Sequence, residues 1–232
     1  MINILNGKIL AFFAHPDDET LGAGATLSRL ARQGSEIHVA IPATGVLARK
    51  NTKNSSIAEG DLVKLRKDCI KAQGILGIPA ENIHLGNFSD NEIDKHTLLD
   101  LIKWLENIIS VIKPDVIFTH HRFCTNIDHQ YCHEAAVVAT RPSKNSHIAL
   151  IAAEIPSSTG YLKPSCWDPN FYIEVSEKDV RNKIKAMETY KNESRLDPHP
   201  RSPEVLNAIA KVRGSESGYM WAEAFMVQKI LI

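Results

Sequence analysis

Short apolar segments alternate with longer segments of helical periodicity along most of this chain, and that alternation restricts the fold more than any other feature. Runs with the length and composition of buried strands occur at residues 8–14, 36–41, 83–85, 115–118 and 147–153. Helical patterns that each end near a glycine or proline occupy residues 20–31, 58–76 and 98–112. Strands joined through helices require right-handed crossovers and a mostly parallel sheet. The sequence thus predicts an α/β fold, a Rossmann-like three-layer sandwich.

The length of 232 residues and the absence of a linker-like segment predict a single domain over residues 1–232. The pattern is less regular toward the end, where a strand at 170–175 and a helix at 178–191 precede a proline-rich stretch at 197–202. We expect residues 160–232 to be an extension that forms part of the pocket or an interface. The proline-rich stretch is either a connector or a lid.

Composition excludes several classes of function. Lys plus Arg and Asp plus Glu number 27 each, so no net charge attracts nucleic acid or an anionic membrane. No apolar stretch reaches the roughly 18 residues that a membrane-spanning helix needs. The four cysteines lack paired spacing, and the first seven residues lack the regions of a signal peptide. We therefore expect a cytoplasmic protein without nucleic-acid or membrane partners.

In a parallel sheet, ligands bind beyond the carboxyl ends of the strands, near the point where the strand order reverses. Polar residues stand just after the predicted strands, namely His15, Thr44, Asn87, His120 and Glu154. The active site is therefore expected at the C-terminal ends of the strands. This requires the strands at 8–14 and 115–118 to be neighbours.

The densest group of chemically active side chains is the turn Ala14-His15-Pro16-Asp17-Asp18-Glu19. Proline restricts its own φ and the backbone of His15, so this imidazole is held in a defined direction. A charged cap at a helix N-terminus accounts for the acids but not for the histidine. His15 and Asp18 are three residues apart around a turn, close enough to bind one metal ion. A third ligand has to come from elsewhere, and the candidate segment is 119–133.

With these residues the chain resembles the zinc-dependent N-deacetylases called LmbE-like or PIG-L-like. The first motif of that family, Ala/Pro-His-Pro-Asp-Asp-Glu, is intact at residues 14–19. The second motif, usually His-Pro-Asp-His, corresponds to Asn126-Ile127-Asp128-His129. Further matches are Thr44-Gly45, Arg66, Arg213-Gly214 and Ala222-Glu223-Ala224-Phe225, so the resemblance spans nearly the whole chain.

The resemblance implies a hydrolase that removes the acetyl group from a small N-acetylglucosamine-type sugar or glycoconjugate. It assigns His15, Asp18 and His129 as zinc ligands that leave a position for water, and iron(II) accepts the same set. Zinc lowers the pKa of bound water to about 7, and Asp17 would take the proton of that water as general base. The resemblance also implies that a homo-oligomer can form.

The chain departs from the family pattern at Asn126, where a histidine is usual. An amide can donate a hydrogen bond to the reacting carbonyl, but it supplies no proton at neutral pH. Either Asp17 returns the proton to the leaving amine or another histidine does, and His133, four residues after His129, is the first candidate. The other candidates are His120, His121 and His199. Asp128 is expected to orient a ligand histidine or to cap a helix.

A further set of residues is expected to contact the substrate: Glu19, Thr44, Arg66, Asn87, His199 and Arg201. The guanidinium fork of Arg66 or Arg201 suits a phosphate or a sugar oxygen. Cys124 and Cys132 stand near the second motif, but the carboxylate-based site already has its ligands without them.

Three alternatives remain open. The same metal site can hydrolyse an amide in another small molecule. A nucleotide-binding enzyme is suggested by Gly22-Ala23-Gly24, although Leu27 stands where the third glycine of that motif belongs. Small residues there also allow a helix to approach the sheet closely. A non-catalytic binding protein on the same scaffold is the third alternative, and the presence of Asp17 argues against it.

Overall fold

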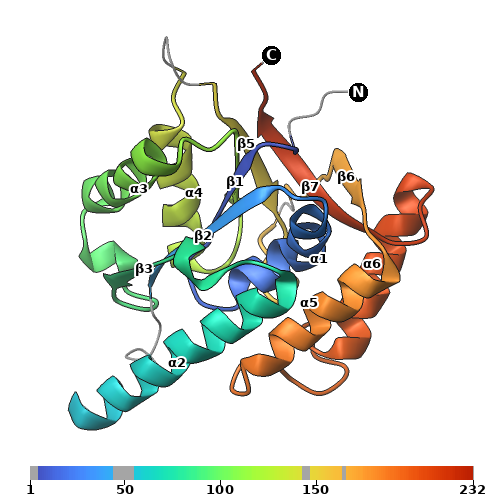
Figure 1. Ribbon diagram of the computed structural model, residues 1–232, viewed down its shortest axis with the longest axis horizontal. Coiled ribbons are helices and arrows are strands. Elements are labelled where there is room, and N and C mark those ends of the chain that lie inside the picture. The colour runs from blue at the N-terminus through green and yellow to red at the C-terminus, as the bar shows by residue number, and fades with distance from the viewer. Residues whose placement is uncertain (1–4, 44–54, 143–146, 164–165, 232) are drawn as a thin grey trace.

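The computed structural model describes residues 5–43, 55–142, 147–163 and 166–231, which form a seven-stranded sheet with helices on both faces (Figure 1). The strands are β1 (Lys8–Phe12), β2 (Glu36–Ala43), β3 (Ile83–Phe88), β4 (Val116–His120), β5 (Ala149–Ala153), β6 (Phe171–Glu174) and β7 (Ala222–Lys229). Their order is β3-β2-β1-β4-β5-β7-β6. β1 to β5 run parallel, whereas β7 pairs antiparallel with β5 and β6. The predicted α/β fold with a mostly parallel sheet is confirmed.

The helices form the two outer layers. One face of the sheet carries α3 (Leu98–Ile112) and α4 (Ile127–Ala139). The other face carries α1 (Asp18–Arg32), α2 (Ser55–Leu76), α5 (Glu177–Thr189) and α6 (Pro203–Ser217). Two short 3-10 helices, η1 (Ala80–Asn82) and η2 (Ile93–Lys95), precede and follow β3. No helix in the described segments is long and apolar enough to cross a membrane.

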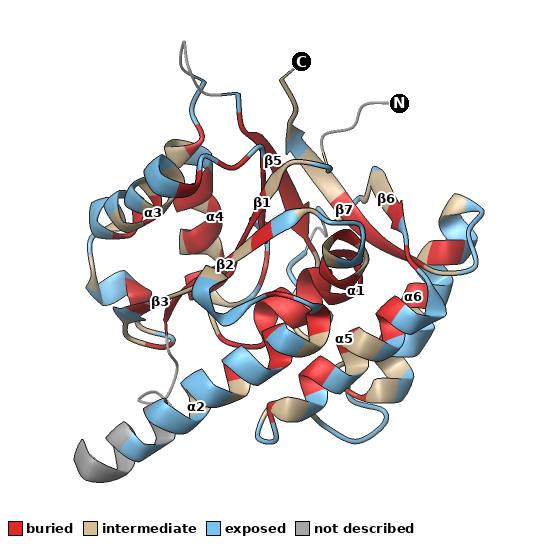
Figure 2. Ribbon diagram, viewed as in Figure 1, coloured by how far each residue is buried: buried red, intermediate tan, exposed pale blue. Residues whose placement is uncertain are grey.

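The central strand β1 is apolar and buried from Ile9 to Phe12, because both of its faces are covered (Figure 2). Ile9 and Ala11 belong to the core beneath α1, α2 and α5, and Leu10 and Phe12 to the core beneath α3 and α4. All four side chains are 0% exposed. A strand buried in this way holds the turn that follows it in a fixed place.

The strand order reverses between β1 and β4. From β1 the chain proceeds outward to β2 and β3, and it then returns to β4 on the opposite side of β1. The pairs Ile9–Val116 and Leu10–Ile117 confirm that the strands at 8–14 and 115–118 are neighbours. The loops that follow β1 and β4 therefore meet at the switch point, where ligand sites form in such sheets.

The C-terminal part of the chain completes this same sheet. The strand expected at 170–175 is β6, and the last segment supplies β7 between β5 and β6. The helix after β4 is α4, which begins at Ile127, so the second motif forms its cap and first turn. Asn126 caps this helix by accepting the backbone N–H of Asp128, which satisfies one of the free amides of the first turn.

A buried ion pair ties β7 and α5 to α1. Lys183 Nζ donates to Glu223 Oε1 at 2.6 Å and to the carbonyl oxygen of Leu21 at 2.7 Å. The carboxylate of Glu223 also accepts the backbone N–H groups of Ala25 (3.3 Å) and Thr26 (2.6 Å). The Lys183 and Glu223 side chains are 8% and 6% exposed, so each charge depends on the other for compensation.

Replacing Lys183 with methionine is expected to lower the free energy of unfolding by about 3–5 kcal/mol, because the Glu223 carboxylate is then buried without a cation. Urea denaturation of the purified variant measures this change. Lys185→Met is the matched control, since Lys185 is exposed on the same helix, and it should change stability by no more than about 0.5 kcal/mol. Equal effects of the two substitutions would refute a structural role for the ion pair.

Candidate active site

The candidate site is built on the turn between β1 and α1. Asp17, just before α1, has a φ of 126°, in the left-handed region that residues with a side chain seldom adopt. Its backbone N–H donates to the buried carboxylate of Glu19 at 3.0 Å, which holds the turn in this conformation. Backbone strain of this kind is concentrated at sites where a side chain must be presented in a set direction.

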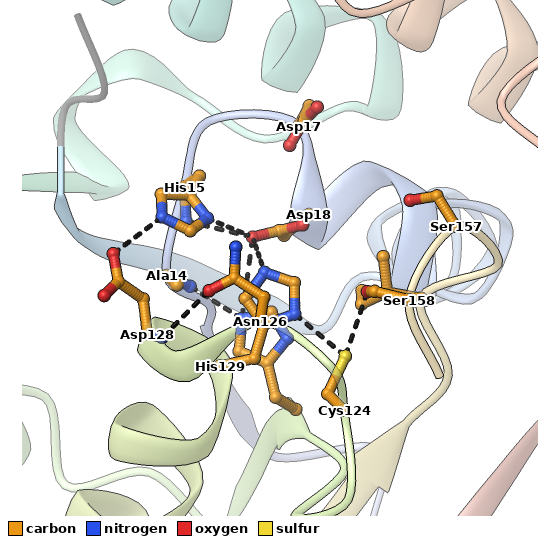
Figure 3. Close-up of polar contacts among 12 residues, drawn as sticks. Ala14, His15, Asp17, Asp18, Cys124, Asn126, Asp128, His129, Ser157 and Ser158 are labelled. Atoms are coloured by element: carbon orange, nitrogen blue, oxygen red, sulfur yellow. Dashed lines mark hydrogen bonds and ion pairs between the residues drawn. The ribbon is translucent and has the colours of Figure 1, made fainter. Parts of the chain in front are cut away.

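His15 of this turn meets Asp18 and His129, which lie in the first turns of α1 and α4 (Figure 3). His15 Nδ1 and His129 Nε2 each lie 3.0 Å from the same oxygen of Asp18, Oδ2. One ligand atom from each of the three residues lies within 4.8 Å of the others. The second oxygen of Asp18, Oδ1, is buried and has no hydrogen-bond partner among the described residues. Two imidazoles and a carboxylate with a spare oxygen fit a zinc or iron(II) ion.

Two further carboxylates lie beside Nε2, the other ring nitrogen of His15. Its Nε2 lies 3.1 Å from Asp90 Oδ1 and 3.0 Å from Asp128 Oδ2. One ligand atom from each of these three residues lies within 4.8 Å of the others, so they are a second group that could hold a metal ion. A metal-binding histidine ordinarily donates its remaining ring N–H to a carboxylate, which fixes the ring and its tautomer. With Nδ1 directed at Asp18, His15 fits this pattern, and Asp128 and Asp90 are the acceptors. The other oxygen of Asp128 accepts the backbone N–H of Ile93 at 3.1 Å.

The ring of His129 is held on two sides. Its Nδ1 lies 3.0 Å from the buried sulfur of Cys124, which also contacts Ser158 Oγ at 2.9 Å. The ring of His120 stacks on His129 with a centroid separation of 3.8 Å, and His120 Nε2 accepts the backbone N–H of Ala14 at 2.8 Å. Cys124 and His120 thus contact the predicted ligand and define its orientation.

The electrostatics of the cluster favour a cation among the ligand nitrogens. Burial disfavours charge on His15, but Asp128, Asp18 and Asp90 outweigh it and raise the pKa of His15 well above its usual value. Burial is likewise outweighed at His129, where Asp18 raises the pKa to about 9. At Asp18, burial acts to raise the pKa, yet His129 and His15 hold it well below the ordinary range. A bound metal cation would supply the positive charge in place of these protons.

Asp17 lies next to this cluster and is 3% exposed. Arg201 Nη1 donates to Asp17 Oδ2 at 2.6 Å and to Glu193 Oε2 at 2.8 Å, and Arg201 Nε donates to Ser157 Oγ at 3.0 Å. Burial raises the pKa of Asp17 well above its usual value, Arg201 opposes this, and the neighbouring carboxylates of Asp18 and Glu193 add to it. A carboxyl group with a raised pKa beside a candidate metal site has the property required of a general base and acid.

A cleft with two adjoining parts opens over the cluster. The inner part has a volume of about 80 Å³ and is lined by His15, Asp17 and Asp90 among others. The outer part has a volume of about 690 Å³ and a polar wall. Residues that line both parts are Asn91, Asn126, His129, Glu193 and Arg201. The cleft therefore leads from the surface to the predicted metal ligands.

Several of the residues predicted to be functional do line this cleft: His15, Asp17, Asn126, His129, His199 and Arg201. Asn126 accepts the N–H of Asp128 and donates to Asn91 Oδ1 at 2.8 Å, so its amide is fixed in the wall. His133 does not line the cleft, because its Nδ1 donates to the backbone oxygen of His120 at 2.8 Å and the ring is 3% exposed.

Three of the predicted substrate contacts are not found in the cleft. Glu19 is 0% exposed, so the prediction that it contacts substrate is at odds with the structure. Arg66 donates to Asn87 at 2.9 Å on the exposed surface, and neither residue lines the cleft. Thr44 lies outside the described residues.

Other residues of the cleft were not predicted from the sequence: Asp90, Asn91, Ser157, Ser158, Glu193 and Arg195. Asp90 follows β3 and Ser157 follows β5, so the position of each after a strand is a signal that points to this edge of the sheet. Glu193 and Arg195 stand after α5, in a segment with no recognisable pattern.

The carboxylate of Glu19 connects the turn between β1 and α1 to α2 and to the C-terminal end of α5. Besides the N–H of Asp17, it accepts hydrogen bonds from Thr20 Oγ1 at 2.7 Å, Gln73 Nε2 at 2.6 Å and Tyr190 OH at 2.9 Å. All of these partners are donors, and Glu19 supplies only acceptor oxygens while it is ionised.

Glu19→Gln is therefore expected to lower the free energy of unfolding by about 2 kcal/mol, since the new amide places a donor against donors. Thermal or urea denaturation measures the loss. Glu188→Gln, an exposed position on α5, is the control and should have little effect. If Glu19→Gln is as stable as the wild type, the four hydrogen bonds do not organise the turn.

The family profile and two curated relatives that match this chain are all described as deacetylases. The family profile described as PIG-L: GlcNAc-PI de-N-acetylase matches residues 10–140. The chain is 33% identical over 192 residues to the uncharacterized deacetylase YaiS of Escherichia coli K12, and the alignment covers 79% of this chain and 90% of that protein. It is 24% identical over 227 residues to a diacetylchitobiose deacetylase of Thermococcus kodakarensis, with 93% of this chain and 81% of that protein covered.

Solved structures share the fold. The N,N'-diacetylchitobiose deacetylase of Pyrococcus horikoshii superposes with a TM-score of 0.74 at 19% identity, covering 95% of this chain and 83% of the other. GalB, the 4-carboxy-2-hydroxymuconate hydratase of Pseudomonas putida KT2440, has a TM-score of 0.74 at 17% identity, covering 97% and 98%. These likenesses establish the fold alone, because one fold hosts different reactions. The profile match and the 33% identical relative go further: this chain belongs to the PIG-L (LmbE-like) family of de-N-acetylases and is an enzyme of that family.

Proposed function

We propose that this enzyme hydrolyses the acetamide group of an N-acetylglucosamine-type sugar, using one metal ion held by His15, Asp18 and His129. The observation that carries the proposal is the meeting of two imidazole nitrogens on one buried carboxylate oxygen, each at 3.0 Å, next to a cleft. Membership of a de-N-acetylase family supports deacetylation. The diacetylchitobiose deacetylase relative supports a sugar substrate.

Zinc, or iron(II), in this donor set supplies Lewis acidity toward water and toward the carbonyl oxygen of the amide. Asp17 is the proposed general base, which accepts a proton as the oxygen of water attacks the acetyl carbon. Arg201 donates to Oδ2 of Asp17, so Oδ1 is the oxygen that we propose takes part in proton transfer. When the C–N bond breaks, the proton passes to the leaving nitrogen, and the products are acetate and a free amine.

Asn126 takes a hydrogen-bonding role in this proposal, and Asp17 carries the proton in both directions. The amide of Asn126 is fixed in the cleft wall by Asp128 and Asn91 and cannot supply a proton at neutral pH. The burial of His133 and its bond to a backbone oxygen argue against it as a proton donor. The raised pKa of Asp17 supports its use as an acid in the second half of the reaction.

Two further predictions are retained. We propose a single domain, because the first and last strands of the chain belong to one sheet. We also propose a cytoplasmic location, since the buried cysteines Cys69, Cys124 and Cys132 form no disulfide. Self-association stays a prediction from the family resemblance, and light scattering measures it.

The test is acetate release by chelator-treated protein before and after addition of zinc or iron(II). We expect no release without metal, and release with metal from N-acetylglucosamine or diacetylchitobiose. N-acetylated amino acids are the matched non-sugar amides. Release from these alone would refute the sugar class, and equal activity with and without metal would refute the metal site.

A further inference from the structure

The outer part of the cleft contains positive charge that the proposed hydrolysis does not use. Arg195 lines this part, and its guanidinium donates to the backbone oxygens of Asn192 and Ser194 in its own loop. Among the described residues, no carboxylate forms an ion pair with Arg195. Arg201 differs in this respect, because Asp17 and Glu193 compensate its charge.

His199 adds a hydrogen-bond donor to the same wall. Its Nδ1 accepts the backbone N–H of Arg201 at 3.1 Å, so in the neutral ring the hydrogen is on Nε2. Slight burial and the charges of Arg201 and Arg195 lower the pKa of His199, which indicates a positive local field. The first turn of α4 faces this region through Ile127, and a helix N-terminus contributes further positive potential.

The sizes of the two parts determine which end of a substrate meets this charge. The inner part, about 80 Å³, adjoins the predicted metal ligands and accommodates a small group such as acetyl. The outer part, about 690 Å³, is left for the remainder of the molecule. Hydroxyl and amide groups of Asn91, Thr125, Ser157 and Ser158 line it and suit the hydroxyls of a sugar. Arg195 and His199 line the outer part and not the inner part, so they are placed to meet a substituent of that sugar and not its acetyl group.

We propose that Arg195 and His199 form a subsite for an anionic group, a phosphate ester or a carboxylate, on the amine portion of the substrate. This inference rests on the proposed function for the direction in which the substrate lies. A guanidinium without a carboxylate partner, beside a neutral N–H donor, matches the oxygens of such a group. The preferred substrate is accordingly an acidic N-acetylated sugar rather than a neutral one.

The kinetic test compares kcat/KM for N-acetylglucosamine with that for its 6-phosphate, its 1-phosphate and N-acetylmuramic acid. We expect at least one acidic substrate to be favoured by about 10- to 100-fold, because a charged hydrogen-bonded contact contributes that much. The phosphates and the carboxylate distinguish the two sources of negative charge. Arg195→Gln should lower kcat/KM for the favoured acidic substrate by about that factor and should lower kcat/KM for N-acetylglucosamine much less, so that the preference is lost.

Lys191→Gln is the matched control, since Lys191 is an exposed cation of the same loop that does not line the cleft. It should retain the preference. Equal kcat/KM for neutral and acidic substrates, or an Arg195→Gln variant that slows both alike, would overturn the subsite.

A binding measurement separates this inference from the proposed function, because it requires no turnover. Titration calorimetry with glucosamine 6-phosphate, 1-phosphate and muramic acid, each against glucosamine, should show tighter binding of at least one acidic ligand, with the advantage lost in Arg195→Gln. If this is observed while no substrate releases acetate, the subsite stands and the proposed hydrolysis fails. If every ligand binds alike, or Arg195→Gln binds as the wild type does, the subsite is refuted whatever the activity.

Discussion

Replacing Asp17 with asparagine is expected to lower kcat by about 10²- to 10⁴-fold, the range that a general base contributes. The substitution keeps the shape of the side chain and removes its capacity to accept and return a proton. Asp17 is not among the three ligands, so metal content should be unchanged. Steady-state kinetics of acetate release and metal analysis of the same preparation measure both quantities.

The control for this variant is Asp94→Asn, an exposed acid in η2 that does not line the cleft. Its kcat should equal that of the wild type. Arg201→Lys extends the test, because lysine keeps the charge beside Asp17 but not the fork that also reaches Glu193 and Ser157. An Asp17→Asn enzyme with wild-type kcat would remove Asp17 from the reaction.

Asp18→Asn is expected to weaken metal binding by more than about 100-fold, exceeding the 10- to 100-fold effect of groups that only orient a ligand. Asp18 Oδ2 is the point at which both imidazoles meet, and its charge favours a cation between them. Activity should fall with metal occupancy. Competition with a fluorescent zinc chelator measures the affinity for zinc. A zinc concentration that saturates the wild-type enzyme should not restore full activity to Asp18→Asn.

Asp90→Asn and Asp128→Asn are the matched variants, because these acids contact the opposite nitrogen of His15. Each should weaken metal binding by about 10- to 100-fold and leave a partly active enzyme. The reverse ranking, with Asp90→Asn abolishing metal binding and Asp18→Asn retaining it, would show that the ion is held by His15, Asp90 and Asp128 instead.

Much of the architecture could be predicted because it depends on local patterns. The apolar run of β1, buried on both faces, marks a central strand, and the alternation with helices requires a parallel sheet. The spacing of His15 and Asp18 is also local, since both belong to one turn. The approach of His129 to Asp18 is different, because it depends on β1 and β4 being neighbours, which the sequence pattern does not determine.

The errors have physical causes. A carboxylate is usually exposed, so nothing in the sequence indicates that Glu19 is buried among four donors. His133 shares a helical face with His129, yet it stands one turn, about 6 Å, farther from the helix N-terminus. At that depth it meets the backbone of His120 instead of the cleft.

The glycines of α1 illustrate a pattern that packing explains. A Cβ atom added at Gly22 would lie 2.9 Å from the Phe13 ring and 3.1 Å from Ile155. The absence of a side chain allows α1 to pack directly against the residues that follow β1 and β5. Gly22-Ala23-Gly24 is therefore accounted for without a nucleotide.

The Arg201 bridge between Asp17 and Glu193 shows why long-range contacts resist prediction. Asp17 and Arg201 are 184 residues apart, and no periodicity relates them. Arg201 was expected to contact substrate; it lines the cleft, and its guanidinium also donates to the proposed general base, a contact that the sequence does not indicate. Only the packing of the C-terminal segment over the first turn brings the two together.

The position of the metal ion tests the central claim most directly. A crystal of zinc-saturated protein, measured with anomalous scattering at the zinc edge, should contain one strong peak in the cleft. We predict that this peak lies about 2.0–2.2 Å from His15 Nδ1, His129 Nε2 and an oxygen of Asp18. A peak between Asp90 and Asp128, or no peak in the cleft of the saturated protein, would contradict the account.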